Sequence, residues 1–460
     1  MNPLSNTSFK DPSGQVFMKH GVIYRGIQPV YRKEYLHLMN SGLYTALTEQ
    51  QLLIPHQKIH RKNQKDYFLV VKPTQIPFIS YPYEWCFGQF KDAALATLKV
   101  QKISLMHDMI LRDASAYNVQ FFAGKPILID TLSFKIYEDG QPWPAYRQFC
   151  MHFLAPLLLM KYKSRQFSKL LRIFLDGVPL NIASALLPIH TWFHPAIVLH
   201  LHLHAKSQQY FADKAVTTKS LRMEKHALIK LIENLEAFIC RLSLKLDTNP
   251  HTWLTYYEKM TYTKRAFAFK KAHVRSFLQS HRPTTVWDVG ANTGTFSYMA
   301  AAYSRQTVSF DMDPDAIEQN YRYGKTHRIT NCLPLLLDLT NPSPSIGFNH
   351  QERMSLVERG PVDMVLALAL IHHLAIANNI PLVNLASFFS QLCRHLVIEF
   401  IPKEDPNVQQ LLANRTDIFD RYTPEDFEAT FVRYFFIKQK TPIIDSKRIL
   451  YLMENKRRLL

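Results

Sequence analysis

The sequence has few cysteines, and none of them stands at the paired spacing of a disulfide framework or a zinc site. Five Cys in 460 residues favour a reducing compartment. The longest apolar stretches, near 153–160 and 182–187, are too short to span a bilayer and are broken by proline. The first six residues are polar, unlike a secretory signal. These absences predict a cytoplasmic protein without a transmembrane segment.

Acidic residues are also scarce compared with basic ones. The chain has 55 Lys and Arg against 37 Asp and Glu, a formal net charge of +18 with His neutral. It is 47% hydrophobic, which is enough for two or three cores, and it has no internal repeat. The positive surplus favours an anionic partner, whether nucleic acid, an acidic glycan or a membrane surface, without choosing among them.

The most informative stretch is an apolar strand at 285–289 that enters a turn and then a helix start. Gly290 and Gly294 lack Cβ atoms, so the turn can be tight and its backbone can approach a ligand. Asn292 stands where a dinucleotide-binding G-x-G-x-x-G loop has glycine, and Asp288 would repel a pyrophosphate. The pattern resembles motif I of class I S-adenosylmethionine (SAM) methyltransferases, whose D-x-G-x-x-x-G loop holds the aminoacid end of the cofactor. A glycine turn of another α/β unit is the alternative.

Two more acidic residues follow predicted strands. Residues 307–311 form a second short strand that ends at Asp311, where a carboxylate can accept hydrogen bonds from both ribose hydroxyls. A third strand at 332–337 precedes Asp338, which resembles the family's acidic contact to the adenine amino group. An Asp that only caps the turn is an equal alternative at that position.

The next two predicted strands supply the candidates for the chemistry. A continuous apolar run at 362–370 is typical of a strand buried on both faces of a parallel sheet, and His373 follows it closely. His373 is a candidate general base, since an unperturbed imidazole titrates near about pH 6.5; packing over the adenine is the alternative. A fifth strand at 395–398 brings Glu399 to the same edge as a second general-base candidate, with a structural pairing to Lys403 as its alternative.

The remaining features restrict the methyl acceptor. Residues 427–437 and 446–453 are strand-prone around a turn at Pro442, as in the antiparallel hairpin that closes a seven-stranded methyltransferase sheet. No N/D-P-P-Y/F motif follows the fourth strand, which disfavours methylation of exocyclic base amines. Cys332 and Cys393 lie inside apolar runs, where a thiol is inert, which disfavours C5-methylation of bases.

The N-terminal part contains a second pattern, in which Asp113 is followed by Asn118 and then by a strand that ends at Asp130. The spacing resembles the catalytic loop and metal-binding segment of protein kinases and aminoglycoside-type phosphotransferases, where the Asp orients a hydroxyl and the other two ligate Mg²⁺. Leu111 replaces the usual His, and no Gly-rich phosphate loop is visible. We expect no metal unless this kinase-like site is active, and then Asn118 and Asp130 are its ligands. A scaffold without phosphotransfer and a chance match are the alternatives.

Helices are expected on either side of the second pattern. Residues 91–109 form one with Met106 on its buried side, and residues 161–174 form another with cations along one face. His200 and His204 share a helical face, but no nearby Cys or HExxH pattern completes a metal site. We therefore expect structural histidines there.

In combination, these motifs resemble one family of bacterial SAM-dependent methyltransferases, often labelled NoeA-like nodulation-protein relatives. The resemblance runs over most of the chain and implies a C-terminal class I methyltransferase, Rossmann-like with a seven-stranded sheet, joined to an N-terminal accessory domain. We expect an α+β domain at 1–150 that is a candidate for a kinase-like fold, a helical continuation at 151–262 and the methyltransferase domain at 263–460.

The sequence thus predicts an enzyme that uses SAM to methylate O or N of a small-molecule, glycan or lipid-linked acceptor. The expected cofactor-binding residues are Asp288, Gly290, Asn292, Gly294, Asp311 and Asp338, and the expected catalytic residues are His373 and Glu399. Two alternatives remain: an ATP-dependent phosphotransferase in the N-terminal half, and an RNA-binding protein or RNA methyltransferase that uses the positive charge.

Overall fold

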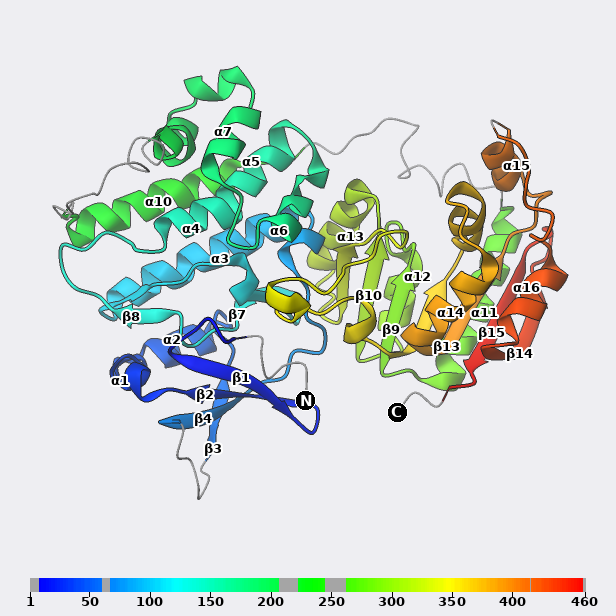
Figure 1. Ribbon diagram of the computed structural model, residues 1–460, viewed down its shortest axis with the longest axis horizontal. Helices are drawn as coiled ribbons and strands as arrows, with labels where there is room; N and C mark the ends of the chain where they lie inside the picture. Colours follow the sequence, from blue (N-terminus) through cyan, green and yellow to red (C-terminus); the bar gives the residue numbers. More distant parts are fainter. Residues whose placement is uncertain (1–7, 60–66, 207–221, 245–261, 414, 458–460) are drawn as a thin grey trace. The chain divides into compact units, whose positions relative to one another are not determined.

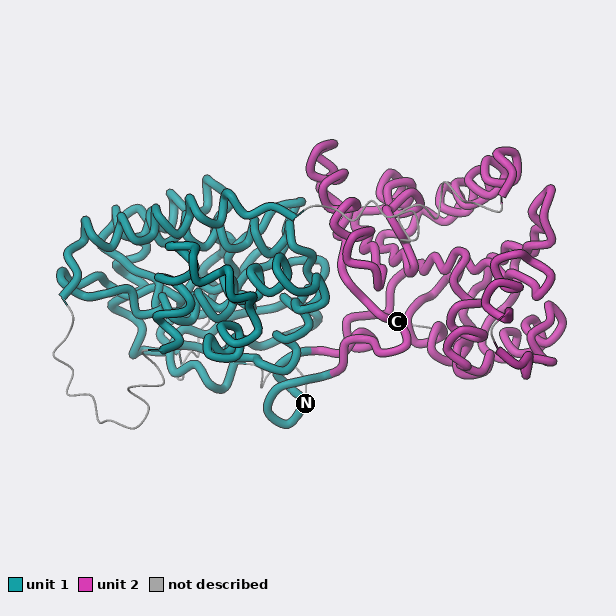
Figure 2. Tube along the Cα trace, turned by 90° about the horizontal axis from the view of Figure 1, so that it is seen from above, with its two compact units in different colours: residues 1–245, 345–353 teal, residues 246–344, 354–460 magenta. Residues whose placement is uncertain are grey.

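The structure is a computed structural model that describes residues 8–59, 67–206, 222–244, 262–413 and 415–457 (Figure 1). The chain divides into two compact units (Figure 2). Unit 1 comprises residues 1–245 and 345–353, and unit 2 comprises residues 246–344 and 354–460. Within the described ranges, no helix is both long and apolar enough to cross a membrane.

Unit 2 alternates strands and helices over most of its length. Its helices are α11 (Lys264–His281), α12 (Thr295–Ala301), α13 (Pro314–Thr326), α14 (Leu382–Leu392), α15 (Pro406–Leu412) and α16 (Pro424–Phe431). Its strands are β9 (Thr285–Val289), β10 (Gln306–Asp311), β11 (Cys332–Leu336), β12 (Val362–Ala367), β13 (Cys393–Phe400), β14 (Phe435–Pro442) and β15 (Ile449–Asn455).

These strands form one sheet of seven in the order β11-β10-β9-β12-β13-β15-β14. The first five strands pair in parallel, and β15 and β14 pair antiparallel. The chain starts in the middle of the sheet at β9, runs outward to β11 and then continues on the other side of β9 with β12. The carboxyl ends of β9 and β12 therefore meet where the strand order reverses, which is where ligands bind in open α/β sheets.

The core of unit 2 follows from the alternation of side chains along the strands. Val286, Met364 and Leu366 belong to one buried cluster with residues of α11 and α12, which cover that face of the sheet. The predicted parallel strands are confirmed, except that the fourth, β12, ends at Ala367 and not at Leu370, because Ala369 has a positive φ of 52°. Because most positions of these five strands are buried on both faces, their sequences are predominantly apolar rather than strictly alternating, with Asp363 and the exposed Arg394 among the exceptions.

The predicted strand at 427–437 is wrong in its first half. Residues up to Phe431 belong to helix α16, and β14 begins at Phe435. Thr423 caps the helix by accepting a hydrogen bond from the backbone N–H of Asp426 at 3.1 Å, and Pro424 occupies the first turn. The aromatic residues that suggest a strand are instead spaced to bury one face of a helix.

Unit 1 has smaller sheets and more helices. Its strands are β1 (Gly14–Lys19), β2 (Val22–Ile27), β3 (His56–Ile59), β4 (Leu69–Pro73), β5 (Met109–Leu111), β6 (Val119–Phe122), β7 (Lys125–Leu128) and β8 (Phe134–Ile136). Its helices include α1 (Arg32–Asn40), α2 (Leu43–Glu49), α3 (Phe87–Met106), α4 (Tyr146–Phe149), α5 (Ala155–Tyr162), α6 (Leu170–Ile173), α7 (Leu180–Leu186), α8 (Pro195–Ile197) and α10 (Lys225–Arg241).

The strands of unit 1 form one antiparallel sheet of four, in the order β1-β2-β4-β3, and two separate pairs, β5-β8 and β6-β7. The pair β5-β8 brackets the segment from Asp113 to Asp130 in sequence, and the hairpin β6-β7 lies within that segment. Residues 345–353, which lie between β11 and β12 in sequence, group with unit 1. There Glu352 forms an ion pair with Lys10 at 2.7 Å.

The two helices predicted around this segment need correction. The first, α3, ends at Met106, whose side chain is 74% exposed rather than buried. The helix predicted at 161–174 is interrupted, because α5 ends at Tyr162 and Ser164 is extended with φ −156°. The Ser164 side chain caps a separate short helix, η6 (Arg165–Lys169).

Candidate active site

The loop between β9 and α12 has the conformation that its glycines require. Gly290 has φ +76° and Gly294 has φ +90°, and a Cβ on Gly294 would lie 2.6 Å from the side-chain amide of Asn320. Asn292 is also left-handed, with φ 51°, a conformation that Asn tolerates better than most residues. Asp288 is 2% exposed and accepts a hydrogen bond from the Ser297 hydroxyl at 2.6 Å. Asp288 therefore ties strand β9 to the start of α12.

Asp311, at the end of β10, lies directly against this loop. Its carboxylate accepts hydrogen bonds from the backbone N–H groups of Asn292 at 2.7 Å and Asp313 at 2.9 Å. Burial raises the pKa of Asp311 to about 6, with the backbone hydrogen bonds acting in the opposite direction. Burial also raises the pKa of Asp288 to about 7. The neighbouring strands β9 and β10 therefore carry two carboxylates of raised pKa near their carboxyl ends, with Asp288 paired to Ser309, two residues before Asp311.

Asp338 follows β11 and shapes its own turn. Its carboxylate accepts hydrogen bonds from the backbone N–H of Thr340 at 2.9 Å and from the Thr340 hydroxyl at 2.6 Å. Its backbone carbonyl accepts from Asn341. These contacts match the turn-capping alternative, and an adenine contact by Asp338 remains a prediction.

The segment after β12 brings two histidines to the same edge. Ala369 has φ 52°, which turns the chain sharply, and the rings of His372 and His373 lie 4.0 Å apart. His372 is fully buried, and neither of its ring nitrogens has a hydrogen-bond partner among the described residues. His373 is partly exposed, and burial lowers its pKa to about 4. Burial also lowers the pKa of His372 well below its usual value, so both imidazoles are neutral near pH 7.

Glu399 is fully buried and forms several contacts at the end of β13. It forms an ion pair with Lys270 at 2.6 Å, and it accepts hydrogen bonds from the backbone N–H of Ala369 at 2.9 Å and from the hydroxyl of Tyr262. Arg448 lies 3.7 Å away on its other side. The alternative pairing of Glu399 with Lys403 is not formed, because Lys403 pairs with Asp417. Burial raises the pKa of Glu399 to about 7.

Lys270 and Arg448 are site residues that the sequence argument missed. Arg448 is 1% exposed and binds Asp405 through two nitrogens, at 2.6 and 3.1 Å. Lys270 lies on α11 in register with buried Ala266 and Val274. Because Lys270 interrupts the apolar face of this helix, the sequence could have predicted that Lys270 is buried and paired with an acidic residue. Arg448 lies in the short connection between β14 and β15 and offers no such signal.

The residues at this edge fit SAM. A carboxylate has about four acceptor positions, and the backbone N–H groups beside Asp311 occupy only part of them. The remaining positions suit ribose hydroxyls, and the orphaned nitrogens of His372 suit a bound ligand at the end of β12. Acidic groups beside the glycine loop favour a cation over a pyrophosphate.

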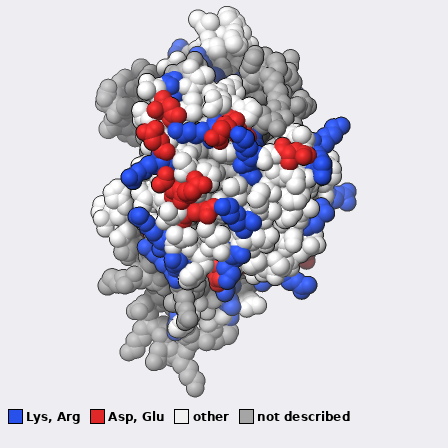
Figure 3. Space-filling model, turned by 90° about the vertical axis from the view of Figure 1, so that its right-hand side faces the viewer, with Lys and Arg blue, Asp and Glu red and all other residues white. Residues whose placement is uncertain are grey.

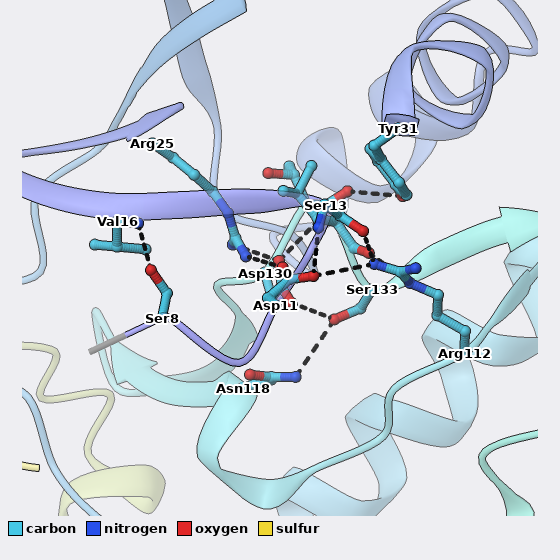
Figure 4. A network of polar contacts seen from close by, with 12 residues as sticks. Ser8, Asp11, Ser13, Val16, Arg25, Tyr31, Arg112, Asn118, Asp130 and Ser133 are labelled. Carbon is cyan, nitrogen blue, oxygen red and sulfur yellow. Dashed lines mark hydrogen bonds and ion pairs between the residues drawn. The ribbon is translucent and has the colours of Figure 1, made fainter. Parts of the chain in front are cut away.

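The kinase-like segment of unit 1 is drawn together by polar contacts (Figure 4). Asn118 donates to the Ser133 hydroxyl at 3.3 Å, and Ser133 donates to Asp130 at 2.7 Å. Asp130 also forms an ion pair with Arg25 on β2. Burial and the nearby Asp130 raise the pKa of Asp113, while a hydrogen bond from Asn118 lowers it. The expected residues therefore converge, but a guanidinium already neutralises Asp130.

Metal binding finds no support in the described parts of the chain. They contain no group of three or more His, Cys, Asp or Glu arranged to hold a metal ion. His200 is buried and hydrogen-bonded to Tyr146 at 2.7 Å and to Asn234 at 3.2 Å. The expectation that these histidines are structural fits these contacts.

Unit 2 has the strand order of the class I SAM-dependent methyltransferase fold, with a glycine loop after β9 and acidic residues near the ends of β9 and β10. The chain is 36% identical over 461 residues to nodulation protein NoeA of Rhizobium meliloti (strain 1021), covering 97% of this chain and 95% of that protein. The chain therefore belongs to the NoeA family.

Other comparisons add little. No protein-family model matches the chain. The N-methyltransferase NodS of Bradyrhizobium japonicum WM9 is 11% identical with a TM-score of 0.31, covering 42% of this chain and 98% of that one. Magnesium protoporphyrin IX methyltransferase of Synechocystis PCC 6803 is 15% identical with a TM-score of 0.32, covering 46% and 96%. Because these TM-scores are low, the fold assignment rests on the strand order.

The buried charge cluster predicts a large stability effect. Arg448→Met should lower the free energy of unfolding of unit 2 by about 3–5 kcal/mol, because Asp405 and Glu399 remain buried with one cation fewer. Chemical denaturation monitored by tryptophan fluorescence measures this. Arg394→Met, which removes an exposed arginine from the same sheet, is the control and should change little. Equal stability of both variants would contradict the structural role of Arg448.

The geometry of Asp311 predicts its effect on cofactor binding. Asp311→Ala should weaken binding of S-adenosylhomocysteine by about 1.5–3 kcal/mol, because charge-assisted hydrogen bonds to the ribose are lost. Since the charged carboxylate is the better acceptor, wild-type affinity should also fall as the pH drops through about 6, where Asp311 takes up a proton.

Calorimetric titration at several pH values measures both effects. Asp313→Ala removes a neighbouring carboxylate that caps α13 by accepting from the backbone N–H of Asp315 at 2.8 Å, and it serves as the control. Unaltered affinity in Asp311→Ala would remove this residue from the site.

Proposed function

We propose that unit 2 transfers the methyl group of SAM to an oxygen or nitrogen of a small-molecule, glycan or lipid-linked acceptor. The observation that carries the proposal is that the glycine loop packs against the segment after β12, since a Cβ on Gly290 would lie 3.1 Å from the Leu370 side chain, two residues before neutral His372 and His373. In this fold that edge holds both cofactor and acceptor. SAM supplies an electrophilic methyl group bound to a sulfonium.

In this proposal, different residues bind the cofactor and accept the proton. Asp311 and the glycine loop hold the cofactor, with Asp288 bracing the loop from within the sheet. His373 accepts the acceptor's proton, since its ring is partly exposed and unprotonated near pH 7. Glu399 acts as a base in the alternative assignment, but its oxygens are occupied by Lys270, Tyr262 and Ala369. These contacts favour His373.

Nucleic-acid bases are the less favoured acceptors. C5-methylation of a base needs a thiolate nucleophile. Burial raises the pKa of the Cys332 and Cys393 thiols well above the usual range, so neither is a thiolate near pH 7. The segment after β12 reads Ala369-Leu370-Ile371-His372-His373 and contains no proline whose carbonyl could accept from a base amine.

Fractionation of labelled products tests the acceptor class. Cell extract incubated with the protein and radiolabelled SAM should carry label chiefly in the small-molecule and organic-soluble fractions. His373→Ala should reduce this incorporation by about 10²-fold or more, in line with the loss of a general base. Heat-inactivated protein provides the background.

Two controls keep the assignments separate. The His373→Ala variant should still bind S-adenosylhomocysteine like the wild type, because His373 is assigned to the acceptor. Label found mainly in RNA or DNA would overturn the small-acceptor proposal. Tight, salt-dependent RNA binding without any transfer would favour the RNA-binding alternative.

For unit 1 we propose a kinase-like scaffold without phosphotransfer. Arg25 and the Ser133 hydroxyl occupy the oxygens of Asp130, so a Mg²⁺ ion would have to displace them. The described residues 14–27 form a plain hairpin without a glycine-rich phosphate loop. The convergence of Asn118 and Asp130 is the observation that keeps the phosphotransferase alternative open.

Nucleotide binding to unit 1 can be measured directly. We expect Mg-ATP to leave the melting temperature of the protein unchanged, since ligands shift it only when they bind the folded state. S-adenosylhomocysteine is the positive control and should raise it. A shift with Mg-ATP that disappears in Asp130→Asn, with the S-adenosylhomocysteine shift retained, would instead support the phosphotransferase.

A further inference from the structure

A group of large apolar side chains is exposed in the helical part of unit 1. Phe193 is 85% exposed and Ile189 is 81% exposed, the highest values for large hydrophobic residues in the described part of the chain. Both lie on the short helix η7 (Ile189–Phe193), which follows α7. Leu199 and Leu203 are each half exposed, and they lie on and just after the helix η8 (Val198–His202), which follows α8. We call Ile189, Phe193, Leu199 and Leu203 the apolar tip.

The apolar tip is held in place by buried polar contacts. The Thr191 hydroxyl lies 3.0 Å from one ring nitrogen of His202, and the Ser184 hydroxyl lies 2.7 Å from the other. The ring of His202 stacks on Trp192 at 4.1 Å. Helices α7, η7 and η8 are therefore fastened to one another. Since Thr191 and Trp192 point inward to His202, Ile189 and Phe193 are left facing outward.

The chain around the apolar tip is strongly basic. Between Gly140 and Lys206 the only acidic residue is Asp176. The basic residues in the same stretch are Arg147, Lys161, Lys163, Arg165, Lys169, Arg172 and Lys206. Elsewhere the charges are mixed: Figure 3 shows acidic and basic side chains interspersed over one face of the protein.

Side-chain contacts place two of these cations, Lys161 and Lys206, close to the helix η7 that carries Ile189 and Phe193. The ammonium of Lys206 lies 4.6 Å from the Trp192 ring, and that of Lys161 lies 5.6 Å from the Tyr162 ring. Tyr162 in turn packs on His190 of η7 at 5.5 Å. Cations therefore lie on both sides of η7.

A pocket beside η7 has the chemistry of an anion site. Its lining includes Lys161, Tyr162, His194, Asn234 and Arg241, and it includes no acidic residue. The carbonyls at the end of α10 would oppose an anion, but those of Cys240 and Leu242 accept hydrogen bonds from Lys91 at 2.8 Å each. The pocket therefore presents a net positive surface.

We propose that this part of unit 1 docks on an anionic phospholipid bilayer, with the apolar tip entering the headgroup region and the pocket holding a lipid phosphate. Protruding aromatic and aliphatic side chains surrounded by Lys and Arg are the composition of an interfacial membrane-binding surface. Each cation near an anionic membrane surface adds to the attraction. A protein partner would instead need a complementary surface that buries the exposed side chains of Ile189 and Phe193. The proposal does not depend on the methyltransferase assignment.

Vesicle co-sedimentation tests the proposal. The full-length protein should sediment with vesicles of phosphatidylcholine and phosphatidylglycerol, and at least about tenfold less with phosphatidylcholine alone, because the electrostatic part is lost. Ile189→Ser with Phe193→Ser should reduce binding to the anionic vesicles by about tenfold or more. Met106→Ser removes a similarly exposed apolar side chain at the end of α3 and should have no effect.

A second variant pair tests the pocket. Lys161→Gln with Arg241→Gln should weaken binding to anionic vesicles and reduce its salt dependence, while Arg275→Gln with Arg394→Gln, exposed cations of unit 2, should do so less. Unchanged melting temperatures and S-adenosylhomocysteine affinity in each variant establish that it is folded.

Three results would overturn the proposal. The first is no binding of the wild type to anionic vesicles, and the second is equal binding of the wild type and the tip variant. The third is a dimer in solution that Ile189→Ser with Phe193→Ser converts to a monomer, which would make the apolar tip a contact between copies. Binding of inorganic phosphate to the pocket without vesicle binding would assign the pocket to a soluble anion instead.

Discussion

The active edge of unit 2 depends on one buried cluster of charges. Glu399 at the end of β13 is paired with Lys270 of α11 and Arg448 between β14 and β15, and Arg448 also binds Asp405 at the start of α15. The cluster thus fastens the helix that leads into the domain, a central strand and the closing hairpin at a single point. Its charges balance, which is the condition under which burying them is tolerable.

The cluster also positions the segment that carries the two candidate histidines. Glu399 accepts a hydrogen bond from the backbone N–H of Ala369, the residue of positive φ that starts the turn into His372 and His373. The direction in which the histidines leave β12 is therefore fixed by a strand and a helix far away in sequence. The sequence offers Glu399 as a general base. In the structure its clearest role is to orient the segment that carries His373, the other candidate base.

Sequence alone predicted the parallel strands, the glycine loop and the order of the acidic residues, because each depends on neighbours within a few positions. An apolar strand, a left-handed turn and a helix start are all encoded locally at 285–297. The partners of Glu399 were missed, because Lys270 and Arg448 reach it only through the folded sheet. The strand expected at 427–437 is wrong in its first half because of a local signal: Thr423 and Pro424 start a helix there, despite the strand-prone aromatic composition. In unit 1 the spacing of Asp113, Asn118 and Asp130 predicted their convergence, but it carried no information on Arg25.

The raised pKa values of Asp288 and Asp311 affect both the pH dependence of folding stability and the charge of the ligand that the loop favours. Asp288, with a pKa of about 7, and Asp311, with a pKa of about 6, bind protons more readily in the folded chain than an unfolded Asp does. Between about pH 4 and pH 7 the folded state therefore holds more protons than the unfolded state, and its stability falls as the pH rises through that window. A bound cation favours the charged carboxylates and offsets part of this cost, whereas a pyrophosphate would increase it. The burial of these two carboxylates thus lowers stability near neutral pH and favours a cationic ligand over an anionic one at this loop.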